Sequence, residues 1–186
     1  FMNIDEMITE KFGITSTDSL PFRATKGSRE ELAAFLGEIG YKVGAEVGVR
    51  AGSYSLRLCR NIPGLALKCV DPWTPFRRNH WRRQEAYYQN TCTILAPYGA
   101  EVIRKTSVDA ARDVPDESLD FVYIDAMHEF DFIMMDILTW VPKVRVGGIV
   151  SGHDYTPPSI FCGVKAAVDT YTQQHDIKQW YITSGH

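Results

Sequence analysis

The chain has 186 residues, of which 45% are hydrophobic and 23% are charged, and its formal net charge is -3. This size and balance are typical of one soluble domain with a substantial core, and they neither require nor exclude a nucleic-acid partner. The four cysteines lie far apart with no C-x-x-C pair, which argues against a zinc site or a disulfide framework. No apolar run approaches the roughly 18 residues that span a bilayer, and no secretion signal is recognisable at the amino terminus, so we expect a cytoplasmic protein.

Apolar runs alternate along the chain with segments of helical pattern. This order predicts an α/β fold, a doubly wound and mostly parallel sheet with helices on both faces. We expect strands over residues 43–47, 65–70, 102–105, 119–124, 149–151 and 179–183. Helices are expected over residues 53–60, 130–140 and 162–174. Ser53 is the expected N-cap of the first helix, Pro142 is expected to stop the second, and Gly147-Gly148 to form a turn. Residues 1–40 are expected to form a helical cap or lid and residues 41–186 the main domain, truncated at its last strand.

The first strand ends in a glycine-rich turn with the spacing E-x-G-x-x-x-G, formed by Glu46, Gly48 and Gly52. Gly48 permits a sharp turn and close approach to a ligand, Gly52 permits close packing at the helix start, and Glu46 can reach a polar group of the ligand. The spacing differs from the G-x-G-x-x-G that binds a dinucleotide pyrophosphate. It favours a ligand without phosphates, S-adenosylmethionine, over NAD, although a turn without a ligand has the same pattern.

Polar residues follow the predicted strands in one register. Each falls at or just beyond the carboxyl end of a strand, where open parallel sheets bind their ligands: Glu46, Asp71, Ser107, Asp125 and Asp154. The alternative for each acid is a helix cap. The shared register predicts an active site at this edge.

From Val43 to Tyr155 the chain resembles the class I S-adenosylmethionine-dependent methyltransferases, whose fold is Rossmann-like. The matching segments are E-V-G-V-R-A-G (46–52), V-D (70–71), T-S-V-D (106–109), L-D-F-V-Y-I-D-A (119–126) and P-K-V-R-V-G-G (142–148). The segments Y-I-D-A-M-H-E-F (123–130), W-V-P-K (140–143) and G-H-D-Y (152–155) are similar to a small-molecule subgroup that includes sugar and natural-product O-methyltransferases. The resemblance implies methyl transfer to a small-molecule acceptor, on a hydroxyl group.

The resemblance also implies a role for each matching position. Glu46 and Gly48 would hold the methionine part of the cofactor, and Asp71 would accept hydrogen bonds from both ribose hydroxyls. Ser107 and Val108 would line the adenine, on which Trp73 would stack unless it is a core or lid residue. The other expected cofactor-binding residues are Val49, Arg50, Gly52, Ser53 and Asp125.

Two histidines are candidates for the base that removes the acceptor's proton: His128, just past the fourth main strand, and His153, just past the fifth. Asp125 is the third expected catalytic residue. Related enzymes often carry an acid or a lysine in the loop after the fourth strand, where this chain has Met127. Either histidine has the alternative of a structural loop residue that bonds a backbone carbonyl.

Asp125 and Asp154 could share a divalent cation, Mg²⁺, with oxygens of the substrate. Several members of the resembled subgroup use a metal in this way. The metal-dependent relatives usually show two adjacent acids after the fifth strand, whereas this chain has His153-Asp154.

Residues 72–90 interleave basic and aromatic side chains and are expected to cover a planar, sugar-like or anionic acceptor, or else to form a solvated amphipathic helix. The amino-terminal apolar residues predict a second lid or a homodimer contact: Phe22, Phe35, Leu36 and Ile39. A nicotinamide oxidoreductase is disfavoured because its fingerprint is missing. A nucleic-acid methyltransferase is disfavoured because D-A-M-H stands where an Asn/Asp-Pro-Pro-aromatic motif is expected. A cofactor-binding domain without activity remains an alternative.

Overall fold

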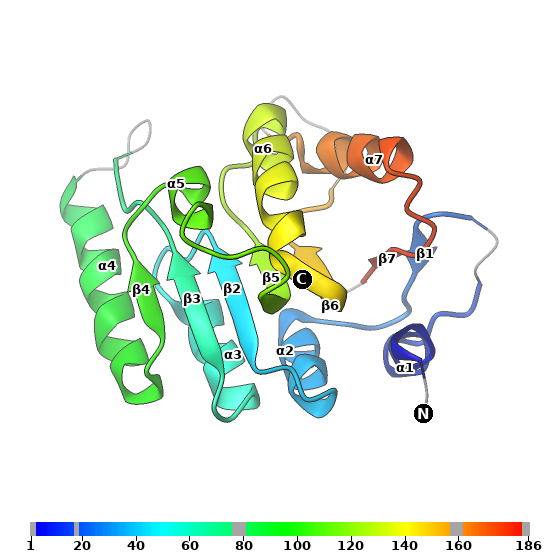
Figure 1. The fold of residues 1–186 in the computed structure, drawn as a ribbon, viewed down its shortest axis with the longest axis horizontal. Coiled ribbons are helices and arrows are strands. Elements are labelled where there is room, and N and C mark those ends of the chain that lie inside the picture. The colour runs from blue at the N-terminus through cyan, green and yellow to red at the C-terminus, as the bar shows by residue number, and fades with distance from the viewer. Residues whose placement is uncertain (1–2, 17–18, 76–80, 157–161, 184–186) are drawn as a thin grey trace.

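A computed structural model describes residues 3–16, 19–75, 81–156 and 162–183 of the chain. Its centre is a five-stranded parallel sheet (Figure 1). In spatial order the strands are β4 (Glu101–Ile103), β3 (Ala66–Val70), β2 (Val43–Val47), β5 (Leu119–Ile124) and β6 (Val144–Gly152). The strand order reverses between β2 and β5, and open sheets of this kind bind ligands at such a reversal.

Helices cover both faces of the sheet, which confirms the predicted doubly wound α/β fold (Figure 1). One face packs against α2 (Arg29–Glu38), α3 (Ser53–Asn61) and α4 (Trp81–Leu95). The other packs against α5 (Ser107–Ala111), α6 (Phe130–Trp140) and α7 (Val164–Gln174). Two 3₁₀ helices, η1 (Ala96–Tyr98) and η2 (Val141–Lys143), follow α4 and α6.

Alternation along the strands explains why both faces are apolar. On β5, Phe121 and Tyr123 join the core under α2, α3 and α4, whereas Val122 and Ile124 join the core under α5, α6 and α7. All four side chains are at most 6% exposed. Such near-continuous apolar runs are typical of parallel strands that are buried on both faces.

The predicted turn at Gly147-Gly148 is wrong, because these glycines lie inside β6 and not before it. The strand therefore begins at Val144 instead of residue 149, and its register on β5 shifts between the pairs Leu119↔Val144 and Phe121↔Ile149. Gly147 has a positive φ of 74°, and a Cβ on Gly148 would lie 2.5 Å from the carbonyl oxygen of Asp120. The glycine pair thus permits an irregularity within a strand, and not a connection between elements.

The amino-terminal residues form α1 (Ile4–Phe12), β1 (Phe22–Arg23) and α2. β1 pairs in parallel with β7 (Tyr181–Ile182), so the last predicted strand joins a separate two-stranded sheet. Phe35 and Leu36 are 2% and 1% exposed and pack inside the chain. These two residues therefore pack within the chain itself, and their burial does not require the predicted dimer contact. The division of the chain at residues 40 and 41 stays a prediction.

Gly48 gives a direct test of how closely the turn after β2 packs. Its φ is +94°, and a Cβ at this position would lie 2.1 Å from the carbonyl oxygen of Asp125. We expect Gly48→Ala to lower the free energy of unfolding by about 3 kcal/mol or more, since neither backbone can yield easily. Gly64→Ala is the matched control: its φ is +76° with no atom within 4 Å of the added Cβ, so only about 1 kcal/mol of backbone strain is expected. Urea denaturation measures both, and equal losses would contradict the close approach.

Candidate active site at the carboxyl edge of the sheet

The parallel sheet brings the predicted polar residues to one edge. Glu46 is the penultimate residue of β2, Asp71 directly follows β3, and Asp125 directly follows β5. Ser107 begins α5 beyond β4, and Asp154 stands two residues beyond β6. The predicted common register is therefore observed in the structure.

The glycine-rich turn connects β2 to α3 at the centre of this edge. Gly48 N–H donates to the carbonyl of Val70, and Asp125 N–H donates to the carbonyl of Val47, which fixes the turn between the two neighbouring strands. Arg50 has a positive φ of 54° and an exposed side chain, whereas Val49 is buried.

Gly52 is the N-cap of α3, with φ 78° and no side-chain cap bond. The predicted cap at Ser53 is therefore wrong, and Ser53 is instead the exposed first residue of the helix. A Cβ on Gly52 would lie 3.0 Å from Ile94 Cδ1 and 3.1 Å from Thr91 Oγ1, both on α4. Gly52 thus supports the close packing expected of it.

The Asp71 carboxylate is hydrogen-bonded to the backbone of the glycine-rich turn and to the backbone just after β3. One carboxylate oxygen accepts from Arg50 N–H at 2.9 Å, and the other accepts from Trp73 N–H at 2.7 Å. Burial raises the pKa of Asp71, and these backbone hydrogen bonds oppose the rise. The backbone N–H of Val49 also acts on this carboxylate, and a vicinal diol would use its remaining lone-pair capacity.

Trp73 is fully buried, with 0% exposure, and packs against Tyr88 at 5.1 Å between ring centroids. Its indole N–H donates to the carbonyl of Arg50 at 2.7 Å. A ring without an accessible face cannot stack on adenine as it stands, so the stacking expectation is not supported. Trp73 instead lies in the core, which was the alternative prediction for it, and its hydrogen bond to Arg50 stabilises the glycine-rich turn.

Glu46 lies beneath α3 at 2% exposure and accepts a hydrogen bond from the hydroxyl of Ser55. Burial raises its pKa to about 8, against the lowering effect of the Ser55 hydrogen bond. The negative charge of Asp125 adds to the rise, and the positive charge of Arg29 opposes it. Glu46 is therefore a buried acid at the centre of the site that is largely protonated at neutral pH.

This burial has a consequence for the pH dependence of stability. Because the folded-state pKa is raised above that of the unfolded chain, the contribution of Glu46 is favourable at low pH and is lost as pH rises from about 4.5 to about 8. We expect Glu46→Gln to be more stable than the parent at pH 8 by on the order of 2 kcal/mol, with little difference at pH 5. Urea midpoints at the two pH values measure the effect, with the exposed Glu30→Gln as control. A parallel fall in parent and variant would contradict the assignment.

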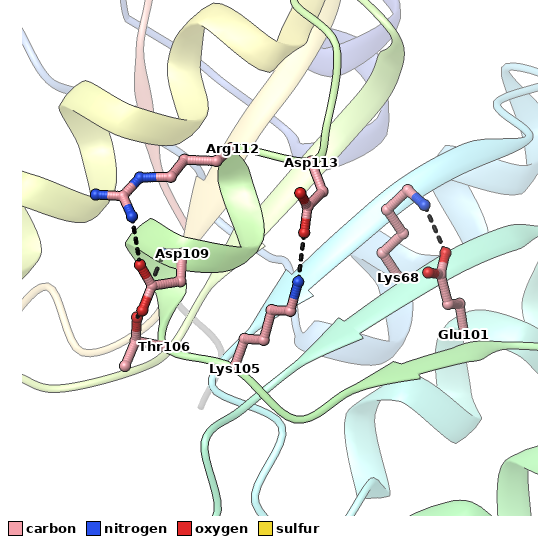
Figure 2. Close-up of polar contacts among 7 residues, drawn as sticks. All are labelled: Lys68, Glu101, Lys105, Thr106, Asp109, Arg112 and Asp113. Carbon is pink, nitrogen blue, oxygen red and sulfur yellow. Dashed lines mark hydrogen bonds and ion pairs between the residues drawn. The ribbon is translucent and has the colours of Figure 1, made fainter.

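Ser107 is placed by the cap of α5. Thr106 accepts from Asp109 N–H at 3.3 Å, and the Thr106 hydroxyl donates to the Asp109 carboxylate at 2.7 Å. Figure 2 shows this cap within a group of surface ion pairs that includes Arg112 with Asp109 at 2.8 Å. The cap fixes the start of the helix next to the carboxyl end of β4.

The Ser107 hydroxyl faces the interior, where it accepts from the indole N–H of Trp140 at 2.8 Å. Burial raises the pKa of Asp136, 5% exposed on α6, to about 6, and a hydrogen bond from Ser107 opposes the rise. The Ser107 side chain therefore already has partners on α6. Ser107 and Val108 are both half-buried, and their contact with adenine stays a prediction.

Three of the predicted catalytic and metal residues form one cluster. His128 Nε2 lies 3.5 Å from Asp125 Oδ1 and 3.3 Å from Asp154 Oδ2. Single ligand atoms of these three residues all lie within 4.8 Å of one another. A hydrogen bond with Asp125 raises the pKa of His128, burial opposes the rise, and the charge of Asp154 adds to it. His153 lies beside this cluster, with its Nδ1 3.0 Å from Asp154 Oδ1.

Sequence reasoning missed one role and one residue of this site. It treated His128 as a base and not as a third donor beside the two aspartates, although its position three residues after Asp125 was a usable signal. It also missed Arg29, at the start of α2, whose Nη1 lies 3.5 Å from Asp125 Oδ2. No local motif links residues so far apart in the chain.

The expected acceptor-binding segment is partly visible as α4. Arg83 Nε donates to the Tyr87 hydroxyl at 2.7 Å, and Arg50 lies 5.5 Å from the centroid of the same ring. A helix that presents these side chains to solvent agrees with the alternative of a solvated amphipathic helix. Phe76, Arg77, Arg78 and His80 of this segment, and the side chain of Trp81, lie outside the described residues.

A methyltransferase-domain family matches residues 45–155, which is more than half of the chain. The chain belongs to this methyltransferase family. The match begins at Ala45, inside β2, and ends just after Asp154, so it includes the five polar residues predicted for the carboxyl edge of the sheet. It does not include Arg29.

Individual relatives are distant. The uncharacterized Sinorhizobium fredii protein y4gI is 25% identical over 118 residues, which is 59% of this chain and 12% of that protein. The chain thus spans about an eighth of the curated relative that it matches. The O-methyltransferase from Bacillus cereus, solved in complex with SAH, is 14% identical with a TM-score of 0.60, over 91% of this chain and 77% of that one. An rRNA-methylase candidate from Clostridium thermocellum is 12% identical with a TM-score of 0.63, over 83% and 84%.

At these identities the solved structures establish the Rossmann-like methyltransferase fold. Together with the family match they support S-adenosylmethionine as the cofactor of this methyltransferase. Within the described part of the chain, no helix has the length and apolar character needed to cross a bilayer.

Proposed function

We propose that this methyltransferase transfers the methyl group of S-adenosylmethionine to a hydroxyl group of a small molecule. The observation that carries the proposal is the position of His128 between Asp125 and Asp154, next to the glycine-rich turn. Gly48 packs directly on the backbone of Asp125, so the expected cofactor turn and the histidine cluster are neighbours. A base beside the cofactor is what a hydroxyl acceptor requires.

Donors and acceptors at the edge fit this cofactor. Asp71 has lone-pair capacity left for the ribose, and the buried hydroxyl of Tyr54 has no hydrogen-bond partner among the described residues. When bound, S-adenosylmethionine supplies a methyl group on a sulfonium that is already activated for transfer. The chain has then to orient the acceptor, exclude water and remove a proton.

His128 takes the proton in this proposal. Nε2–H faces the two carboxylates, which orient the ring and stabilise its charged form, and this leaves Nδ1 to accept the hydroxyl proton. As the acceptor oxygen gains the methyl group it loses its proton to His128, and S-adenosylhomocysteine is released. His153, with one contact to Asp154, is the alternative base.

A divalent cation at Asp125 and Asp154 is an alternative to proton removal by His128, because an imidazole that binds the ion through Nε2 is no longer the base described above. The two carboxylates and the His128 imidazole are close enough to bind one ion. Because Mg²⁺ prefers oxygen ligands, the nitrogen donor favours Mn²⁺ or Zn²⁺ over the Mg²⁺ expected from the sequence. The ion would lower the pKa of an acceptor hydroxyl bound to it.

A radiolabel assay tests the proposed function. The chain is incubated with methyl-labelled S-adenosylmethionine and three acceptor groups: hydroxylated aromatics, sugars, and ribosomal RNA as a control for the Clostridium relative. Each is run with EDTA, Mg²⁺ or Mn²⁺. We expect label in a hydroxylated small molecule. Label in RNA alone would contradict the acceptor class, and cofactor binding without transfer to any acceptor would favour a binding domain without activity.

A further inference from the structure

A cation from the amino-terminal part of the chain lies at the predicted cofactor site. Arg29 is the first residue of α2, and the start of this helix is fixed by a capping box between Ser28 and Glu31. Its guanidinium reaches Asp125 at 3.5 Å and lies 5.8 Å from the centroid of the Tyr54 ring. Arg29 therefore reaches from outside the segment that matches the family into the centre of the site.

The groups around Arg29 are buried and incompletely paired. Among the described residues the Tyr54 hydroxyl, 4% exposed, has no hydrogen-bond partner, and the Tyr123 hydroxyl, 1% exposed, faces the Arg29 guanidinium. The two rings pack together at 4.2 Å between centroids, and the positive charge of Arg29 acts on both. A buried hydroxyl without a partner is rare in folded proteins, and its position beside the Arg29 guanidinium indicates a place where a polar ligand completes the hydrogen bonding.

Arg29 has donor capacity for such a ligand. A guanidinium has five N–H donors, and those of Arg29 face Asp125 in one 3.5 Å contact and the Tyr123 hydroxyl, which leaves further donors for a ligand. Its side chain is 41% exposed, so an incoming anion can reach it. A carboxylate could be bound by the fork of donors that Asp125 does not use.

The topology indicates which part of the cofactor would lie here. Asp71, the expected ribose ligand, follows β3 on one side of β2, whereas Asp125 and Arg29 lie on the β5 side. If the ribose is bound at Asp71, the amino-acid end of the cofactor points across the glycine-rich turn toward Arg29. That end carries one carboxylate and one ammonium group.

We propose that Arg29 binds the carboxylate of the cofactor's methionine part. The inference rests on the proposed use of S-adenosylmethionine, and it assigns a ligand-binding role to the amino-terminal segment. The competing explanation is that Arg29 only neutralises Asp125 and stabilises the fold.

The test compares two ligands that differ in one group. S-adenosylhomocysteine has the carboxylate, whereas S-adenosyl-3-thiopropylamine has the amine but lacks the carboxylate. We expect the parent chain to prefer the first roughly ten- to hundredfold, and Arg29→Ala to lose this preference while it binds the second ligand as the parent does. Arg29→Lys should keep part of the preference. Arg57→Ala, which removes an exposed ion pair with Glu30, is the matched control and should change neither affinity.

The outcomes separate this inference from the proposed function. If Arg29→Ala keeps the full preference, or weakens both ligands equally, Arg29 does not bind the carboxylate. If the parent binds neither ligand, the proposed cofactor use fails, and the inference fails with it. Thermal denaturation of each variant shows whether the fold is retained.

Discussion

Asp71→Ala is expected to weaken the binding of S-adenosylhomocysteine by roughly a hundredfold or more. The carboxylate would accept two hydrogen bonds from the ribose diol, and hydrogen bonds to a charged group contribute about 1.5–3 kcal/mol each. Its oxygens also accept from the backbone of Arg50 and Trp73, so the variant loosens the turn as well. Calorimetric titration measures the affinity.

A second ligand separates the loss of hydrogen bonds to the ribose from the loosening of the turn. The 2′-deoxy analogue of S-adenosylhomocysteine lacks one ribose hydroxyl, so it should bind the parent more weakly and lose less affinity in the variant. Glu101→Ala, at an exposed acid that begins β4 at the opposite edge of the sheet (Figure 2), is the control and should bind as the parent does. Unchanged affinity of Asp71→Ala would place the ribose elsewhere.

His128→Ala is expected to lower turnover on the hydroxyl acceptor by roughly a hundredfold or more, with cofactor affinity nearly unchanged. A base must be neutral to accept a proton. Because the hydrogen bond with Asp125 raises the pKa of His128 above 6.5, parent activity should rise with pH through a value above 6.5. That step should be missing in the variant.

His153→Ala is the matched comparison, because this histidine contacts Asp154 but not Asp125. We expect a much smaller loss of turnover and an unchanged pH profile. Initial rates over a pH series measure both variants. A larger loss in His153→Ala would exchange the two roles, and full activity in both would leave proton removal to a metal or to water.

The main elements of the fold could be predicted from local sequence. The strand over residues 119–124 and the helix over residues 130–140 have the predicted bounds, because an apolar run broken only by Asp120 marks the strand and a helix-stopping proline marks the end of the helix. β6 was predicted too short because a glycine pair is the same signal for a turn and for an irregular strand. Only the packing of Gly148 on the carbonyl of Asp120 distinguishes the two.

The position of the site at the edge of the sheet could be predicted from the sequence, but the burial of its side chains could not. Acids after strands indicate the edge of the sheet, yet they do not show that Glu46 lies beneath α3 or that Trp73 faces the core. Burial of this kind depends on helices that pack from elsewhere in the chain. The contact of Arg29 with Asp125 joins α2 to the end of β5, and no spacing rule predicts a contact over that separation.

Titration of the chain with S-adenosylhomocysteine and with NAD, each followed by calorimetry, tests the central assignment most directly. The account predicts saturable binding of S-adenosylhomocysteine in the micromolar range and no binding of NAD, because the turn at Gly48 lacks the dinucleotide fingerprint. Binding of NAD alone would contradict the cofactor assignment, and with it the roles proposed for Asp71, Arg29 and His128.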